Sequence, residues 1–109
     1  MLENNEKIME HLCDLMKRKY PDQNADLPKY YQWSELTVKL SAINQSSCAV
    51  PIDINKVKRY AKLLKNGTVF PPIICLNIGG YELFDGIHRL LANKMNKQET
   101  VTIYSGNLN

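Results

Sequence analysis

The sequence has few cysteines, no long apolar run and little net charge. Its three cysteines, Cys13, Cys48 and Cys75, are odd in number and far apart. This pattern favours reduced thiols over a disulfide framework or a zinc site. No stretch approaches membrane-spanning length, and residues 1–10 carry acids and amides where a secretory signal needs a basic start and an apolar run. We therefore expect a cytoplasmic protein that does not enter a membrane.

Length and composition indicate one folded domain. The 109 residues exclude separate cofactor and substrate domains, and 44% hydrophobic with 23% charged residues is ordinary for a globular chain. Fourteen Lys and Arg against eleven Asp and Glu leave a net charge of +3, which is too small to indicate nucleic-acid binding by itself. Internal repeats and low-complexity tracts are absent from the sequence.

The first part of the chain reads as a separate helix. Apolar residues from Ile8 to Tyr20 recur at helical spacing, which predicts an amphipathic helix over residues 2–20 that stops at Pro21. Polar residues and Pro28 then indicate a linker. We predict residues 1–28 to be an appended helix and linker and residues 29–109 to be the domain. The apolar stripe must be buried on this domain or on another chain.

The domain itself alternates strand and helix patterns. Tyr30, Tyr31 and Trp33 form an aromatic cluster, expected to pack in the core rather than to stack on bases, at the start of a strand that reaches Leu40. Residues 41–49 read as a loop. Asp53 is expected to cap a basic helix that ends at Asn66-Gly67.

The C-terminal half continues this alternation. Gly79-Gly80 predicts a tight hairpin between two apolar strands. Asp85 is the expected N-cap of a third helix that ends near Asn96, a last strand covers residues 101–104, and the tail 105–109 is expected to fray. The predicted class is α/β, in the broader sense α+β, with a small mixed sheet and packed helices.

The run Asp85-Gly86-Ile87-His88-Arg89 is the strongest candidate for chemistry. It places Gly, His and Arg in the first turn of a helix directly after a strand, where backbone N–H groups lack partners and favour an anion. This arrangement predicts a phosphate cradle formed by Gly86, His88 and Arg89. The same spacing is equally typical of a plain helix start with solvated side chains.

Residues 51–104 resemble the ParB/sulfiredoxin-like superfamily. The resemblance lies in the order of elements, in Pro71-Pro72-Ile73-Ile74 and in Gly86-Ile87-His88-Arg89 followed by Leu-Leu-Ala. In that superfamily the matching helix start binds nucleotide phosphates, ATP in sulfiredoxins and free serine kinases and CTP in ParB partition proteins. The resemblance implies phosphate contacts for Gly86, His88 and Arg89, and a nucleotide-contacting role for Lys56.

Three departures narrow what the resemblance implies. Sulfiredoxins have a catalytic cysteine where this chain has Ile87, so sulfiredoxin activity is not expected. Partition proteins have an Arg-Arg pair where this chain has His88-Arg89. Free serine kinases share an Asp-Gly motif but have a further glutamate in the loop that corresponds to residues 44–50, which here holds no carboxylate; Glu35 or Asp53 would have to replace it.

These observations lead to two main hypotheses and one weaker alternative. The first is a small nucleotide-binding domain for ATP or CTP, with or without Mg²⁺. If this domain is an enzyme, it is a phosphotransferase or NTP hydrolase in which Asp85 acts as base or metal-contacting carboxylate. The second is a non-catalytic interaction module, such as a phage or mobile-element regulator or inhibitor. It would bind a protein partner through residues 2–20 and the aromatic cluster at Tyr30, Tyr31 and Trp33, or a second copy through residues 2–20. The third is a ParB-like DNA-binding protein that uses the basic helix at Lys56–Lys65.

Overall fold

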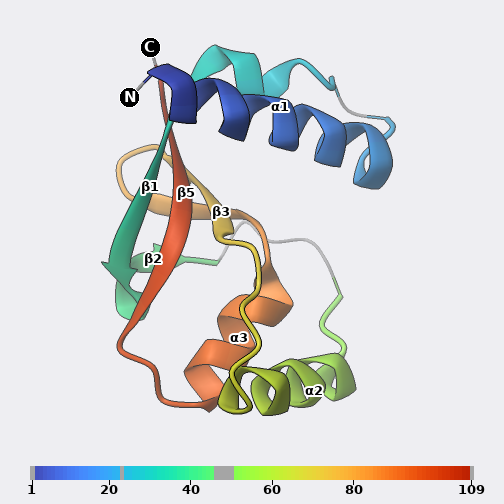
Figure 1. The fold of residues 1–109 in the computed structure, drawn as a ribbon, viewed down its shortest axis with the longest axis vertical. Helices are drawn as coiled ribbons and strands as arrows, with labels where there is room; N and C mark the ends of the chain where they lie inside the picture. Colours follow the sequence, from blue (N-terminus) through green and yellow to red (C-terminus); the bar gives the residue numbers. More distant parts are fainter. Residues whose placement is uncertain (1, 23, 46–50, 109) are drawn as a thin grey trace.

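The computed structural model describes residues 2–22, 24–45 and 51–108. Within these residues five strands form one mixed sheet in the order β1-β5-β3-β4-β2 (Figure 1). The β1–β5 and β3–β4 pairs are antiparallel, whereas β3–β5 and β2–β4 are parallel. The strands are β1 (Tyr31–Lys39), β2 (Ile43–Asn44), β3 (Ile73–Asn77), β4 (Tyr81–Asp85) and β5 (Thr100–Leu108). The predicted α+β class with a small mixed sheet is confirmed.

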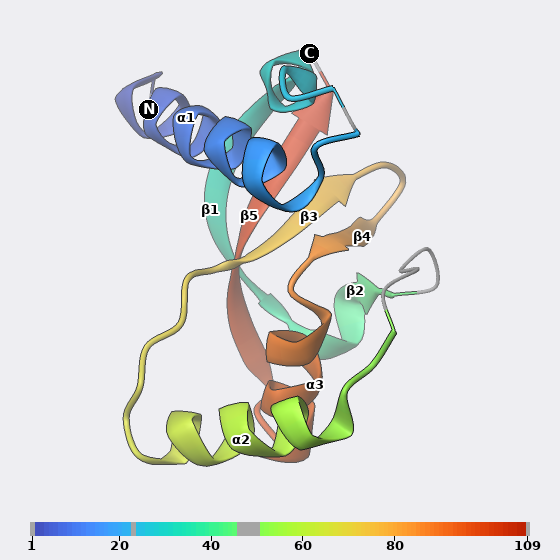
Figure 2. The ribbon, with the colours of Figure 1, turned by 90° about the vertical axis from the view of Figure 1, so that its right-hand side faces the viewer.

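Helices lie at opposite ends of this sheet. Figure 2 shows α1 across one end, while α2 and α3 lie side by side at the other. Their bounds are α1 (Leu2–Lys19), α2 (Ile54–Lys65) and α3 (Ile87–Met95), with short 3₁₀ helices η1 (Leu27–Tyr30) and η2 (Leu40–Ala42) on either side of β1.

Successive side chains of the sheet pack into two separate apolar clusters, one on each face. On β3, Ile74 packs in the cluster of α1, whereas Ile73 and Cys75 pack in the cluster of α3. This follows from strand geometry, because successive side chains point to opposite faces. A third cluster joins α2 to α3 through Val57, Ala61 and Ala92. The sheet is therefore buried on both faces where these strands cross the middle of the molecule.

The helix α1 packs along its predicted apolar stripe. Ile8, Leu12 and Leu15 contact Trp33 and Ile74. The Trp33 side chain is 5% exposed, and its indole Nε1 donates a hydrogen bond of 2.8 Å to the carbonyl of Pro28. The prediction that the aromatic cluster packs in the core is therefore confirmed for Trp33, and it is wrong for Tyr30, which is 60% exposed. The stripe of α1 is buried on the chain's own sheet.

Several local predictions are confirmed in detail. The side chain of Asp53 accepts hydrogen bonds from the backbone N–H groups of Asn55 and Lys56 at the start of α2. After the C-terminal end of α2 the chain turns away at Gly67, which has a φ of +91°. The hairpin between β3 and β4 turns at Gly79 and Gly80, both with positive φ.

Two predictions for the ends of strands are wrong. Residues 105–108 do not fray, because β5 pairs with β1 from Thr100 opposite Lys39 to Leu108 opposite Tyr31. Gly106 permits this pairing: a Cβ atom there would lie 2.7 Å from the Trp33 ring. The segment expected to be a loop from residue 41 includes η2 and the short strand β2, and its remainder, with Cys48, lies outside the described residues.

Candidate functional site

The strand β4 passes into α3 at Gly86. Its φ of +111° is in the region that favours glycine, and its carbonyl accepts the first helical hydrogen bond from Leu90 at 2.9 Å. Gly86 is thus the N-cap, and the prediction that Asp85 caps this helix is wrong. Asp85 is the last residue of β4, and its side chain makes contacts elsewhere. No side chain of a described residue caps α3, so its first-turn N–H groups remain available to a ligand.

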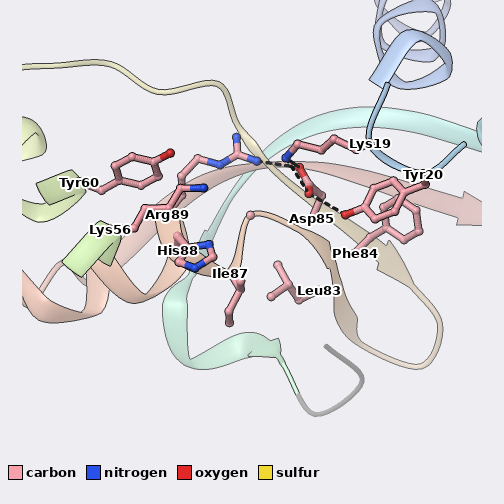
Figure 3. A pocket seen from close by; sticks show the side chains of 11 residues that line it. Lys19, Tyr20, Lys56, Tyr60, Leu83, Phe84, Asp85, Ile87, His88 and Arg89 are labelled. Carbon is pink, nitrogen blue, oxygen red and sulfur yellow. Dashed lines mark hydrogen bonds and ion pairs between the residues drawn. The ribbon is translucent and has the colours of Figure 1, made fainter. Parts of the chain in front are cut away.

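Asp85 is a buried carboxylate at the end of its strand. It is 8% exposed and accepts hydrogen bonds from Tyr20 Oη at 3.0 Å and from Arg89 Nη2 at 3.0 Å (Figure 3). The ammonium of Lys19 lies 3.3 Å from one carboxylate oxygen and 3.5 Å from the other. A buried carboxylate needs such partners to remain charged. Asp85 thereby links the C-terminal end of α1 to the first turn of α3.

The guanidinium of Arg89 is held on two sides. Besides Asp85 it contacts the backbone carbonyls of Pro71 and Pro72, to which Nη1 donates at 2.7 and 3.1 Å. The guanidinium also lies over Gly86, where a Cβ atom would come within 2.9 Å of Nη2. The guanidinium therefore fills the space beside Gly86 in which a Cβ atom would lie.

His88 connects the starts of α2 and α3. Its Nε2 accepts a hydrogen bond of 3.1 Å from the backbone N–H of Asp53, the capping residue of α2. Burial, and then the nearby positive charge of Lys56, lower the pKa of His88 below its ordinary value of 6.5. The imidazole is therefore neutral at neutral pH. With Nε2 acting as acceptor, its proton lies on Nδ1.

These residues surround one pocket of about 290 Å³ (Figure 3). All five candidates from the sequence line it: Lys56, Asp85, Gly86, His88 and Arg89. Tyr60 of α2 also lines it, and Lys56 Nζ lies 5.6 Å from the centre of its ring. Glu35, considered as a replacement for a missing glutamate, instead lines a different hollow beside Pro71 and Pro72.

Two further lining residues come from outside the stretch 51–104, and neither was a candidate from the sequence. Lys19 and Tyr20 reach the pocket from the end of α1. The sequence predicts this helix to be an appendage, and no local motif connects it with β4, which follows more than sixty residues later. The only sequence signal for their role is that Lys19 and Tyr20 stand directly before Pro21, where the helix is predicted to stop.

The charge of the pocket favours an anion. Lys19, Lys56 and Arg89 are cationic, whereas Asp85 is the single carboxylate among the described lining residues. The partial positive charge of the α3 N-terminus adds to this excess. The arrangement can bind a phosphate or polyphosphate by direct contact with three cations from three helices.

Other types of site find little support in the described part of the chain. It holds no group of three or more His, Cys, Asp and Glu residues placed to bind a metal ion. Burial raises the pKa of Cys75 to about 12, so this thiol is a packing group rather than a nucleophile. Ile87, at the position of the sulfiredoxin cysteine, is 4% exposed and packs in the core.

Among residues 2–22, 24–45 and 51–108, no helix has the length and apolar character needed to cross a bilayer.

Comparison with known proteins gives matches at the level of fold. No model of a known protein family matches the sequence, and no curated protein matches it. Among solved structures, sulfiredoxin from Arabidopsis thaliana superposes with a TM-score of 0.60 at 23% identity, over 68% of this chain and 88% of the other.

Two ParB structures match over similar parts of this chain. The C-terminally truncated chromosome-partitioning protein ParB from Caulobacter crescentus, complexed with CTP-γ-S, has a TM-score of 0.60 at 15% identity, over 70% of this chain and 46% of the other. A pNOB8-like ParB N-domain has a TM-score of 0.58 at 22% identity, over 71% of this chain and 31% of the other. This chain therefore spans less than half of either ParB chain. Together with the sheet order and the site at the start of α3, these matches show that the chain has the ParB/sulfiredoxin-like fold.

Proposed function

We propose that the pocket at the start of α3 binds the phosphate chain of a nucleotide, ATP or CTP. One observation carries this proposal: cationic side chains from α1, α2 and α3 line a single pocket into which an uncapped helix N-terminus opens. Phosphate oxygens are the ligands that such a set of donors binds well. The fold adds support, since a ParB structure of the same fold is complexed with CTP-γ-S.

Each candidate residue has a distinct role in this proposal. Lys56 and the first-turn N–H groups of α3 contact phosphate directly. His88 is a neutral donor through Nδ1, because Nε2 already accepts from the Asp53 N–H. Arg89 presents a guanidinium whose position is set by Asp85 and two carbonyl groups. Such preorganisation lowers the entropic cost of binding.

Asp85 fits a positioning role better than a base or a metal ligand. Both of its oxygens accept hydrogen bonds, from Tyr20, Lys19 and Arg89. A Mg²⁺ ion would be placed beside two cations with one carboxylate to bind it, and the donor set does not fit a protein-held magnesium site. We therefore propose nucleotide binding without assigning a phosphoryl-transfer step.

Among the described residues, the apolar stripe of α1 packs on the chain's own sheet, which gives the interaction-module hypothesis less support. It required the apolar stripe of α1 and the aromatic cluster to be free for a partner. In the structure Leu12 and Leu15 pack against Trp33, so these side chains already cover one another. Tyr30, at 60% exposure, is the one large ring of that cluster that faces solvent.

Calorimetric titration with ATP, CTP and GTP, with and without Mg²⁺, tests the proposal. We expect binding of at least one nucleotide, weakened about tenfold by Lys56→Ala and about tenfold to a hundredfold by Arg89→Ala, as losing a charge-assisted hydrogen bond costs about 1.5–3 kcal/mol. Lys65→Ala, at the far end of α2, is the control and should leave affinity unchanged. Absence of binding by the folded wild-type chain would refute the proposal.

A further inference from the structure

Lys19 lines the pocket, and its positive charge is only loosely paired with Asp85. Its ammonium is 3.3 and 3.5 Å from the Asp85 oxygens, longer than a strong charge-assisted hydrogen bond, and its side chain is 53% exposed. Arg89 and Tyr20 both bind the same carboxylate more closely, at 3.0 Å. The single negative charge of Asp85 is thus largely matched by Arg89. An exposed, loosely paired ammonium is free to contact a second anion.

The backbone that carries Lys19 is held in place on both sides. Before it, Leu15 and Met16 of α1 are buried, and the Tyr20 N–H continues the helical pattern with a 2.9 Å bond to the Met16 carbonyl. After it, the Tyr20 ring packs against Phe84 with centroids 6.0 Å apart, and its hydroxyl binds Asp85. The chain therefore presents Lys19 to the pocket in the folded protein without a further conformational change.

The cations of the pocket are spread along it. Figure 3 shows the Arg89 guanidinium between the Lys19 ammonium on one side and Lys56 with Tyr60 on the other. A ligand with a single phosphate group fits at one end of such a row, whereas a chain of phosphates contacts all of it. Two positive charges remain after Asp85 is matched, which complements a ligand carrying at least two negative charges.

We infer that Lys19 is a phosphate-contacting residue supplied by the N-terminal helix, and that it selects ligands with two or more linked phosphates over monophosphates. This inference rests on the proposed function and assigns one part of its selectivity to a residue outside the stretch 51–104. The ligand lies along Lys56, Arg89 and Lys19, with one end of its phosphate chain against the Lys19 ammonium.

Inorganic phosphate, pyrophosphate and tripolyphosphate are the probes for this inference, because they report the phosphate contacts without a base. Titration calorimetry of the full chain should show affinity rising with the number of phosphates. Lys19→Ala should weaken tripolyphosphate binding about tenfold, the equivalent of about 1.4 kcal/mol, and leave monophosphate binding within about twofold. Lys19→Arg should restore most of the lost affinity, since it restores the charge.

Lys17→Ala is the matched control. It removes a cation from the same helix at an exposed position outside the pocket, and it should not change the preference for tripolyphosphate. Thermal unfolding of each variant shows whether the Lys19 substitution has disturbed the fold, and Lys19→Gln provides a second, less disruptive replacement.

The outcomes separate the two proposals. If the wild-type chain binds neither nucleotides nor any of the three phosphate probes, the proposed function and this inference both fail. If it binds them and Lys19→Ala and Lys19→Gln retain the full preference for tripolyphosphate, the inference fails and the proposed function stands. An equal loss for Lys17→Ala would also overturn it, because the effect would then be a general one of net charge.

Discussion

At the scale of single residues, Gly86 meets two separate requirements. Its φ of +111° is costly for any residue with a Cβ atom, and the Arg89 guanidinium occupies the space such an atom would need. Gly67 has a similar φ of +91° with nothing within 4 Å of the corresponding position. The two glycines therefore differ in the presence of a close neighbour.

This difference makes a quantitative prediction. Gly67→Ala should lower the free energy of unfolding by about 1 kcal/mol through backbone strain alone, and Gly86→Ala by about 2–3 kcal/mol because Arg89 must also move. Urea unfolding of the two variants measures both values. Equal losses would show that Arg89 adapts without cost and does not require this glycine.

His88 makes stability depend on pH. Because its pKa in the folded protein is lowered from 6.5, the fold favours the neutral imidazole. Its contribution is therefore complete above 6.5 and is lost as the pH falls from 6.5 through the lower pKa of the folded state. We expect the wild type to lose stability relative to His88→Gln as the pH falls below 6.5, in urea unfolding at a series of pH values. Parallel curves for the two proteins would contradict the lowered pKa.

At the scale of elements, the contact between α1 and the sheet carries a clear stability prediction. Leu12 is 2% exposed and packs in the cluster that contains Trp33 and Ile74. Leu12→Ala should lower the free energy of unfolding by about 2–5 kcal/mol, as expected for a buried leucine truncated to a cavity. Glu10→Ala, at an exposed position of the same helix, is the control and should change it by less than about 0.5 kcal/mol. Similar values for both would mean that α1 does not pack as described.

The elements that the sequence predicts well are those set by local rules. Asp53 caps α2 by accepting hydrogen bonds from the N–H groups two and three residues later. Gly79-Gly80 forms the hairpin turn because both glycines can adopt a positive φ. Both effects act within a few residues, so the local sequence contains them. The end of β5 is different. Ser105, Gly106 and Asn107 are small or polar, and this segment becomes a strand through pairing with β1, about seventy residues earlier.

The residues of the candidate site also divide into those that the local sequence predicts and those that only the tertiary fold brings together. The motif at Gly86, His88 and Arg89 and its link with Lys56 could be read from residue types and from the resemblance to a known superfamily. The partners of Asp85 could not, because Lys19 and Tyr20 meet it only through the packing of α1. The prediction that Asp85 caps the helix is wrong because Asp85 is the last residue of β4, and its side chain binds Lys19, Tyr20 and Arg89.

At the scale of the whole molecule, the division into residues 1–28 and 29–109 remains a prediction. It predicts that a chain beginning at Lys29 still folds, although it loses the cover over Trp33 and Ile74 and the two pocket contacts from α1. We expect a cooperative thermal transition by circular dichroism at a lower temperature than for the full chain. A transition at the same temperature would mean that α1 does not stabilise the domain, and an unfolded product would mean that the boundary is wrong.

The burial of Trp33 beneath α1 has a practical consequence. It is the chain's single tryptophan, so all indole fluorescence comes from the interface between this helix and the sheet. Detachment of the helix would expose the indole to water and shift its emission to longer wavelength, while the strands behind it remained paired. Emission spectra of the unlabelled protein therefore report the docking of α1 separately from global unfolding. The same signal can be followed during titration with the ligand proposed to contact Lys19, at the other end of the same helix.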